Sequence, residues 1–487
     1  MWSPVIESMD WPIIIDRARS AEGVAVVAAL VFGLGCCAKF LQGKPQEKHR
    51  RGTLLVDGRL SQRRGTRLKR SRRGLLTLAG VPIAAADETK HFKLIGTTGT
   101  GKSTAIRELL GAALARGDRA IFADPDGGYW AQFFDRYRGD IILNPFEPDS
   151  VKWDLFAEIQ NTYDIEQLAA GLIPNSDDPS SSEWRGYART FLAAVVRNCH
   201  EHGRRDMDNL WRLLTMAPVE ELRPIVSGSP AQPFLDPDNA RMFSSIRSVM
   251  GSAIAAFEYI RSQRASPFSV RAWVRGRTLP GALFLPYKAG QIAALRSMIA
   301  AWMRLALFEA MNQAEAHDQR LWFVVDELDA LGAIDGLKDA LARLRKFGCR
   351  CVIGFQSASQ VSGTYGQSAQ TIVENCGNTL ILRCSSSESG GTAQFASRLI
   401  GDREILRRQQ SRGSDRDSAL SVRGGRRSRS FTEQHTTEPA VLSSELEQLP
   451  DLCGYFKSAS SSQWLKVSFG RRLGTNRGQR FRRLLFP

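Results

Sequence analysis

The octapeptide Gly96-Thr-Thr-Gly-Thr-Gly-Lys-Ser103 decides the fold of this chain. It has the spacing G-x-x-x-x-G-K-[ST] and lies between an apolar stretch at 91–95 and a helical pattern at 102–116. Its glycines let successive backbone N–H groups curl around phosphate oxygens, and the helix N-terminus adds the positive end of its dipole. The motif predicts an α/β fold in which a strand, a loop and a helix hold the phosphates of a nucleotide.

The residues of this loop have separate predicted roles. Lys102 reaches the β and γ phosphates, and Ser103 offers its hydroxyl to Mg²⁺. The alternative is a glycine-rich turn that binds nothing, but a Lys-Ser pair at the start of a helix argues against it. The predicted nucleotide-binding set is therefore Gly96, Thr97, Thr98, Gly99, Thr100, Gly101, Lys102, Ser103 and Thr104.

A second motif, Leu321-Trp-Phe-Val-Val-Asp-Glu327, is an apolar strand that ends in two acids. In a Walker B element the first acid, here Asp326, holds the shell of the magnesium ion, and the second, Glu327, orients or deprotonates the attacking water. The same pattern also fits a core strand with a capping acid. Its pairing with the upstream phosphate loop favours the catalytic role.

Two further side chains are candidates for the same chemistry. Gln356 follows the apolar stretch 350–355, where an amide can sense the γ-phosphate or cap the next helix. Arg345 lies between the two strands, where a cation can reach a nucleotide on an adjacent subunit and neutralise charge in the transition state. Arg343 and Arg350 compete for that role, and an ordinary solvated helix end is the alternative.

The order of strand and helix patterns predicts the domains. Strands at 91–95, 119–123 and 139–143 alternate with helices, and the alternation resumes with strands at 282–285, 321–325, 350–355 and 378–383 and helices at 291–314 and 337–346. Helical patterns at 187–199, 207–215 and 242–260 lie between them. We predict a mainly parallel sheet in a nucleotide-binding domain with two parts, 91–152 and 266–470, separated by an all-α domain at 153–265.

The N-terminal region predicts a membrane anchor. Gly23 to Ala38 carries no charge and extends to Leu41 if Lys39 snorkels, which gives one transmembrane helix within residues 1–42. A secretory or lipoprotein signal is the alternative, but Gly33 and the acids at 10, 16 and 22 fit it poorly. The segment 43–90 leads into the core. Its residues 44–73 hold twelve Lys and Arg against two acids, which predicts a cytoplasmic location for the bulk of the chain.

Charge and cysteine content indicate the kind of partner and compartment. Lys and Arg number 66 and Asp and Glu 50, so the net charge of +16 favours a polyanionic partner such as nucleic acid or an anionic membrane face. The eight cysteines form no C-x-x-C pair, which suggests neither zinc nor a disulfide framework. We predict a mobile Arg- and Ser-rich loop at 403–430 and a basic tail at 471–487.

These motifs together resemble the type IV coupling proteins of the TraD and TrwB kind, from Arg51 to Phe469. Several short stretches carry the resemblance beyond the phosphate loop: Arg51-Gly52, Asp124-Pro-Asp-Gly-Gly-Tyr129, Asn144-Pro-Phe146, Trp153, Trp184 with Tyr187 and Arg189, Pro267-Phe-Ser-Val270, Phe355-Gln-Ser357, Tyr365-Gly366, 439–442 and 445–450. The resemblance implies a RecA-like core with an inserted all-α domain that engages DNA or a relaxase.

The resemblance also implies ATP and Mg²⁺ as cofactors. Lys102 and Ser103 would bind them, Asp326 and Glu327 would serve hydrolysis, Gln356 would sense the nucleotide, and Arg345 would act in trans. The implied protein is a hexamer in the bacterial inner membrane that links a relaxosome to a type IV secretion channel. Many relatives have two membrane helices, whereas residues 1–16 are too short and too charged for a second one.

Four functions remain open at this point. A conjugative DNA translocase would grip the DNA backbone, single-stranded during transfer, without reading its sequence. A double-stranded DNA pump of the chromosome-segregation type would normally carry more membrane spans and a sequence-reading module. A substrate-recruiting receptor would use ATP binding for assembly, and a membrane-tethered P-loop protein of another kind is the plainest alternative.

Overall fold

The computed structural model of the chain describes residues 48–63, 74–175, 178–276, 280–315, 319–388, 390–414 and 427–470. The predicted transmembrane helix and the basic tail lie outside these residues. In the part of the chain that is described, no helix is both long and apolar enough to cross a membrane. The chain divides into two compact units, one of them Met1–Gly52 with Asp402–Glu438 and the other Thr53–Gly401 with Pro439–Pro487.

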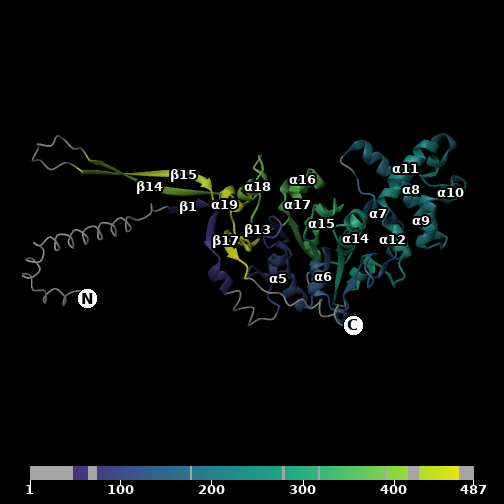
Figure 1. Cartoon of the computed structure of the whole chain (residues 1–487), viewed down its shortest axis with the longest axis horizontal. Coiled ribbons are helices and arrows are strands. Elements are labelled where there is room, and N and C mark those ends of the chain that lie inside the picture. The colour runs from purple at the N-terminus through teal and green to yellow at the C-terminus, as the bar shows by residue number, and fades with distance from the viewer. Residues whose placement is uncertain are drawn as a thin grey trace, which may run out of the picture. The chain divides into compact units, whose positions relative to one another are not determined.

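A ten-stranded sheet forms the centre of the larger unit (Figure 1). The strands run from β13 to β7 in parallel, and β16 and β17 join antiparallel beside β13. Their order across the sheet is β2 (Leu54–Asp57), β17 (Gln463–Ser468), β16 (Cys453–Lys457), β13 (Asn378–Ile381), β5 (Phe92–Ile95), β12 (Arg350–Phe355), β11 (Leu321–Val325), β6 (Arg119–Pro125), β10 (Ala282–Tyr287) and β7 (Ile141–Ile142).

Each predicted strand of the core is present, and only the strands at 321–325 and 350–355 keep both of their predicted ends. The largest difference is at 139–143, of which only Ile141 and Ile142 are in a strand. Gly139 has a left-handed φ of 81° and caps the preceding turn. The carboxylate of Asp140 accepts hydrogen bonds from the backbone N–H groups of Asp135 and Ala282. Side-chain bonding at Asp140 therefore replaces the start of the predicted strand.

Both faces of the sheet are covered, which explains the continuously apolar strands. In β6 the side chains of Ala120 and Phe122 join one buried cluster, and those of Ile121 and Ala123 join the other. The first cluster includes α5 (Lys102–Ala115) and the hairpin β3 (Thr77–Leu78) and β4 (Val81–Pro82); the second includes α14 (Ile292–Met311) and α15 (Leu337–Arg343).

Short elements complete the larger unit: α4 (Ala85–Glu88), α6 (Gly128–Phe133), η1 (Arg136–Arg138), η2 (Phe156–Glu158), α13 (Val270–Arg275), η5 (Leu344–Phe347), α16 (Ala358–Tyr365), α17 (Ser368–Glu374), α18 (Gly391–Ile400) and α19 (Ser443–Glu447). The predicted helix at 337–346 is thus divided into α15 and η5. The predicted helix at 291–314 is α14, which begins one residue later and ends three residues earlier than predicted.

Six helices form a bundle that Figure 1 shows beyond α14, away from β13 and β17. They are α7 (Thr162–Leu172), α8 (Pro179–Glu201), α9 (Met207–Thr215), α10 (Val219–Val226), α11 (Ala240–Ala253) and α12 (Phe257–Ser262), with η3 (Gln232–Leu235) and η4 (Pro237–Asn239) between α10 and α11. The predicted helix at 242–260 is broken between α11 and α12, because a turn there keeps Ile254, Phe257 and Ile260 fully buried.

Two short parallel strands connect this bundle to the sheet. Lys152 and Trp153 of β8 pair with Pro267 and Phe268 of β9, so the chain leaves and returns at one place. The buried Trp153 ring lies 6.1 Å from the ring of Trp302 on α14. The bundle therefore shares its base with the core of the larger unit, because buried apolar residues of α7 and α14 belong to one cluster.

The smaller unit corrects the prediction of an irregular loop at 403–430. Residues 402–414 form β14 (Asp402–Ser414), and residues 427–439 form β15 (Arg427–Pro439), in a sheet of order β1 (Lys48–Gly52), β14, β15. Glu404 accepts hydrogen bonds from Arg50 and Arg51, and Arg403 lies 2.7 Å from Glu438. Charged pairs across the strands replace the apolar alternation that identifies a strand in a sequence.

Candidate nucleotide-binding and hydrolysis site

The phosphate loop lies between the ends of two neighbouring strands. Gly96 N–H donates to Phe355 O at the end of β12, and Thr97 N–H donates to Arg383 O just after β13. Lys102 begins α5, and its Nζ donates to Gly96 O at 2.6 Å and to Thr97 O at 3.1 Å. Burial lowers the pKa of Lys102, against the opposing charges of Asp326 and Glu327. The predicted loop thus has the curled form that presents N–H groups to phosphate.

Leu452, just before β16, contacts the phosphate loop and helps to hold its conformation. Gly101 has a φ of +117°, and a Cβ there would come 2.9 Å from Leu452. Leu452 N–H donates to Thr100 O at 2.9 Å, and Leu452 itself has a positive φ of 61°. A leucine in this conformation is strained, and such strain persists only where the surroundings fix it. No motif in the sequence predicts this contact.

Asp326 meets the phosphate loop directly. Its Oδ2 accepts hydrogen bonds from Ser103 Oγ at 2.7 Å and from Tyr129 Oη at 2.6 Å. Among the described residues, its buried Oδ1 has no hydrogen-bond partner. A buried carboxylate oxygen that lacks a partner beside a serine hydroxyl matches the oxygen ligands and bound waters that Mg²⁺ prefers. The donor set therefore fits the predicted magnesium site.

Glu327 and Gln356 form a chain of hydrogen bonds with the phosphate loop. Thr98 Oγ1 donates to Gln356 Oε1 at 2.7 Å, and Gln356 Nε2 donates to Glu327 Oε1 at 3.1 Å. Burial, with the nearby charge of Asp326, raises the pKa of Glu327, which makes this carboxylate a stronger base. The helix-capping alternative for Gln356 fails, since Ser357 accepts from Gln360 N–H and caps α16.

The segment Asp124–Trp130 adds residues to the site for which the motifs predicted no chemical role. Asp124 is the last buried residue of β6 and accepts hydrogen bonds from the backbone N–H groups of Tyr129 at 2.9 Å and Trp130 at 2.6 Å. Burial raises the pKa of Asp124 to about 7, although those two N–H groups oppose the shift. Burial and the charge of Asp326 raise the pKa of Tyr129, so its hydroxyl remains a donor.

The three candidate arginines lie in different surroundings. Arg343 and Arg345 are exposed, at the end of α15 and in η5, where the chain approaches the amino end of β12. The phosphate loop follows the carboxyl end of β5, so Arg345 does not face the nucleotide site of its own chain. Arg350 is excluded as a finger because it is 5% exposed and bound to Glu88 at 3.2 Å.

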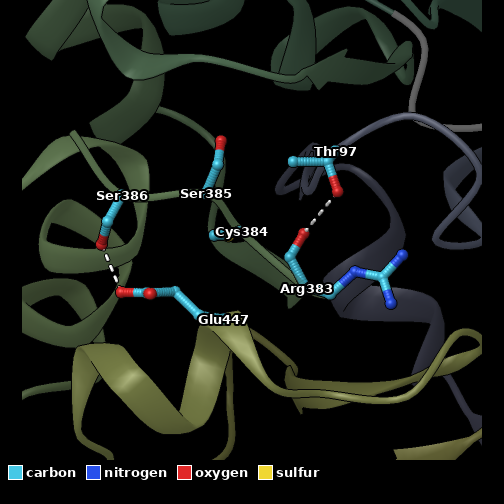
Figure 2. A pocket seen from close by; sticks show the side chains of 6 residues that line it. All are labelled: Thr97, Arg383, Cys384, Ser385, Ser386 and Glu447. Carbon is cyan, nitrogen blue, oxygen red and sulfur yellow. Dashed lines mark hydrogen bonds between the residues drawn. The ribbon is translucent and has the colours of Figure 1, made fainter.

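A pocket of about 340 Å³ flanks the phosphate loop on the side of β13, away from Asp326. Figure 2 shows its lining, with Cys384, Ser385 and Ser386 on the chain after β13 and Glu447 of α19 opposite them. Thr97 Oγ1 donates to Arg383 O at 3.3 Å, and Ser386 Oγ donates to Glu447. Five of the six lining residues have polar or charged side chains, and none is aromatic.

The chain is similar in sequence to proteins of known families. A family model described as the type IV secretion-system coupling protein DNA-binding domain matches residues 75–470. The chain is 30% identical over 459 residues to the coupling protein TraD of Escherichia coli (strain K12), a match that covers 90% of this chain and 62% of TraD. It is 22% identical over 419 residues to a conjugal transfer protein TraG of Escherichia coli, covering 77% of this chain and 63% of TraG. The chain thus spans less than two thirds of the length of these relatives.

Solved structures of the coupling protein TrwB are similar over most of the chain. The unbound monoclinic form of TrwBdeltaN70 has 30% identity and a TM-score of 0.76, covering 90% of this chain and 97% of that one. TrwB in complex with ADP and Mg²⁺ has the same identity, TM-score and coverage. TrwB in complex with the ATP analogue ADPNP has 29% identity and a TM-score of 0.75 over 90% of this chain and 97% of that one.

Proposed function

Because this chain belongs to the type IV secretion-system coupling proteins, we propose that it is a membrane-anchored ATPase that moves DNA from a relaxosome into a type IV secretion channel. The main support for this proposal is the 2.7 Å hydrogen bond from Ser103 to Asp326. It joins the phosphate loop to the Walker B strand, although the two residues lie 223 positions apart in the chain. The net charge of +16 supports an interaction with the DNA backbone that does not depend on sequence.

The proposed cofactors are ATP and Mg²⁺. The similar protein TrwB has been solved in complex with ADP and Mg²⁺. Mg²⁺ would neutralise charge on the β and γ phosphates. Ser103 and Asp326 would hold it, and Lys102 would leave its two loop carbonyls to bind phosphate oxygens. Glu327 would take a proton from the attacking water, held in orientation by Gln356. The polar pocket beside Thr97 would receive the sugar and base of the nucleotide.

The proposed assembly is a homo-hexamer in the bacterial inner membrane. The apolar stretch 23–41 would span the membrane once, and the positive segment after it would keep both compact units in the cytoplasm. In a hexamer, Arg345 of one chain would reach the nucleotide of the next chain. It does not reach the nucleotide of its own chain, because it lies toward the opposite edge of the sheet from its own phosphate loop. The relaxase and the channel proteins are the proposed protein partners, and the DNA is proposed to be single-stranded.

The test is the ATPase rate of the full chain in detergent, with and without DNA and over a range of salt concentrations. We expect DNA to stimulate hydrolysis and salt to remove the stimulation, because phosphate contacts weaken as salt rises. Lys102→Ala and Glu327→Gln should each abolish turnover. Hydrolysis that ignores DNA at every salt concentration would favour a substrate-recruiting receptor instead, and normal turnover in Lys102→Ala would contradict the nucleotide site itself.

A further inference from the structure

Tyr129 is buried beside the acids of the nucleotide site, although neither the phosphate loop nor the Walker B element contains it. Its side chain is 2% exposed, and its ring stacks on that of Phe122 at 5.5 Å between centroids. The guanidinium of Arg107 lies 5.7 Å from the ring centroid. Its hydroxyl donates to Asp326 Oδ2 at 2.6 Å. A tyrosine packed in this way delivers one hydroxyl to a fixed point.

The backbone that carries Tyr129 is fixed to the same sheet. In the parallel pairing of β11 with β6, Val325 lies beside Ala123, so Asp326 and Asp124 follow at neighbouring strand ends. Asp124 then accepts hydrogen bonds from the N–H groups of Tyr129 and Trp130 at the start of α6. The distance between the tyrosine hydroxyl and Asp326 is therefore set by the sheet and not by a flexible loop.

Two hydroxyls share one oxygen of Asp326. Ser103 and Tyr129 both donate to Oδ2, and in the described residues the buried Oδ1 accepts from neither. A P-loop serine turns its hydroxyl oxygen to the metal when a magnesium nucleotide binds. The proton of that hydroxyl stays free to donate, so Ser103 would bind the metal through its oxygen and still donate to Asp326. Tyr129 would be the second donor to Oδ2, on a carboxylate that is 4% exposed.

We propose that Tyr129 is a positioning residue that holds Oδ2 of Asp326 while Mg²⁺ and nucleotide are bound, so that Oδ1 faces the metal's shell of ligands. This inference rests on the proposed function, since it requires a magnesium nucleotide at the phosphate loop. It assigns Tyr129 to metal binding and not to nucleotide binding. Loss of the hydroxyl should therefore weaken the metal and leave the metal-free nucleotide unchanged.

The experiment compares the full chain with Tyr129→Phe, which removes one oxygen and keeps the stacked ring. Mn²⁺ is titrated in the presence of ADP and followed by electron paramagnetic resonance, and ADP binding is measured separately in EDTA. We expect Mn²⁺ affinity to fall roughly three- to tenfold, which corresponds to the ordinary net strength of one hydrogen bond. We expect ADP affinity in EDTA to stay within a factor of about two, because the phosphate loop is intact.

Tyr187→Phe is the matched control, because it also removes a tyrosine hydroxyl that donates to a carboxylate, that of Glu183 in the helical bundle. It should leave both affinities unchanged. Equal Mn²⁺ affinity in the wild type and Tyr129→Phe would overturn the inference. A parallel loss of Mn²⁺ and ADP affinity would also overturn it, because it would show that Tyr129 only supports the structure of the site. If Tyr129→Phe does not fold, Tyr129→Met fills the space without a donor and takes the same test. Failure of the wild-type chain to bind Mn²⁺ with ADP would instead contradict the proposed function.

Discussion

At the scale of single residues, the site depends on side chains that join motifs to one another. Gln356 accepts from Thr98 of the phosphate loop and donates to Glu327. The motifs predicted Thr98, Glu327 and Gln356 one by one, because each follows a recognisable strand. They could not predict the bonds between them, and they gave Tyr129 no role, because such contacts depend on how strands far apart in the chain become neighbours.

Replacing Gln356 with alanine should lower kcat about 10- to 100-fold, because Glu327 loses the partner that orients it. ADP affinity should change little, since the N–H groups of the phosphate loop are untouched. Steady-state ATPase kinetics and calorimetric ADP binding separate the two effects. Gln360→Ala, on the exposed face of α16, serves as the control. An equal loss of ADP affinity and kcat in Gln356→Ala would show that the amide supports the loop and not the base.

His91 should make stability depend on pH. Its Nε2 lies 3.0 Å from Leu341 O, and its Nδ1 accepts from Cys351 N–H at 3.0 Å, so the ring is neutral. Burial lowers its pKa to about 4 from the usual 6.5. The unfolded chain therefore binds more protons between these values, and the free energy of unfolding falls by up to about 1.4 kcal/mol per pH unit as pH drops from 6.5 to 4.

His91→Asn should weaken this dependence, because asparagine tolerates the positive φ of 54° at this position and does not titrate. Thermal unfolding midpoints measured between pH 7 and pH 4.5 test it. The wild type should lose more stability than the variant as pH falls, and the exposed His202→Asn variant should follow the wild type. Parallel profiles for all three proteins would rule out His91 as the group responsible.

At the scale of elements, predictability follows the pattern of buried apolar residues. The strands β11 and β12 begin and end where the sequence predicted, because both faces of each are buried and the apolar run is continuous. The strands β14 and β15 were missed because arginines and polar residues fill them and charged pairs hold them. The β3–β4 hairpin within 43–90 was also missed, since two-residue strands have no period to detect.

Gly354 of β12 lies in close contact with the backbone of Asp326, which follows β11. A Cβ there would lie 2.4 Å from Asp326 O, a backbone atom that cannot move without shifting β11. Gly354→Ala should therefore lower the free energy of unfolding by about 1–3 kcal/mol and reduce hydrolysis, since Asp326 and Glu327 follow β11. Gly363→Ala on α16 is the control. A Cβ there meets nothing within 4 Å, so that variant should gain up to about 1 kcal/mol. Chemical unfolding curves measure both, and a Gly354→Ala protein as stable as the wild type would contradict the close approach.

At the scale of the whole molecule, the proposed site is divided between two chains. Lys102 lies at the carboxyl edge of the sheet, and Arg345 lies near His91, toward the amino edge. A ring in which each chain faces the next in the same direction joins these edges, because its interfaces are heterologous. Sequence motifs predict both residues but contain no information about which chain each one serves.

Mixing two inactive variants should restore hydrolysis if Arg345 acts in trans. Lys102→Ala lacks a working phosphate loop but keeps Arg345, and Arg345→Ala has the opposite defect. In equal mixtures, about one quarter of the interfaces combine an intact loop with an intact arginine. ATPase activity should therefore reappear at a fraction of the wild-type rate. Arg343→Ala should be active on its own. Mixtures that stay as inactive as their components would contradict a shared site.

The paired strands β8 and β9 have a consequence for how this protein changed over time. Lys152 and Pro267 lie side by side, so the helical bundle enters and leaves the core across one strand spacing, about 4.8 Å. An insertion with adjacent ends can lengthen, shorten or be replaced while the surrounding sheet keeps its connections. The bundle can therefore be exchanged as a unit while the sheet that carries the candidate nucleotide site keeps its strand order.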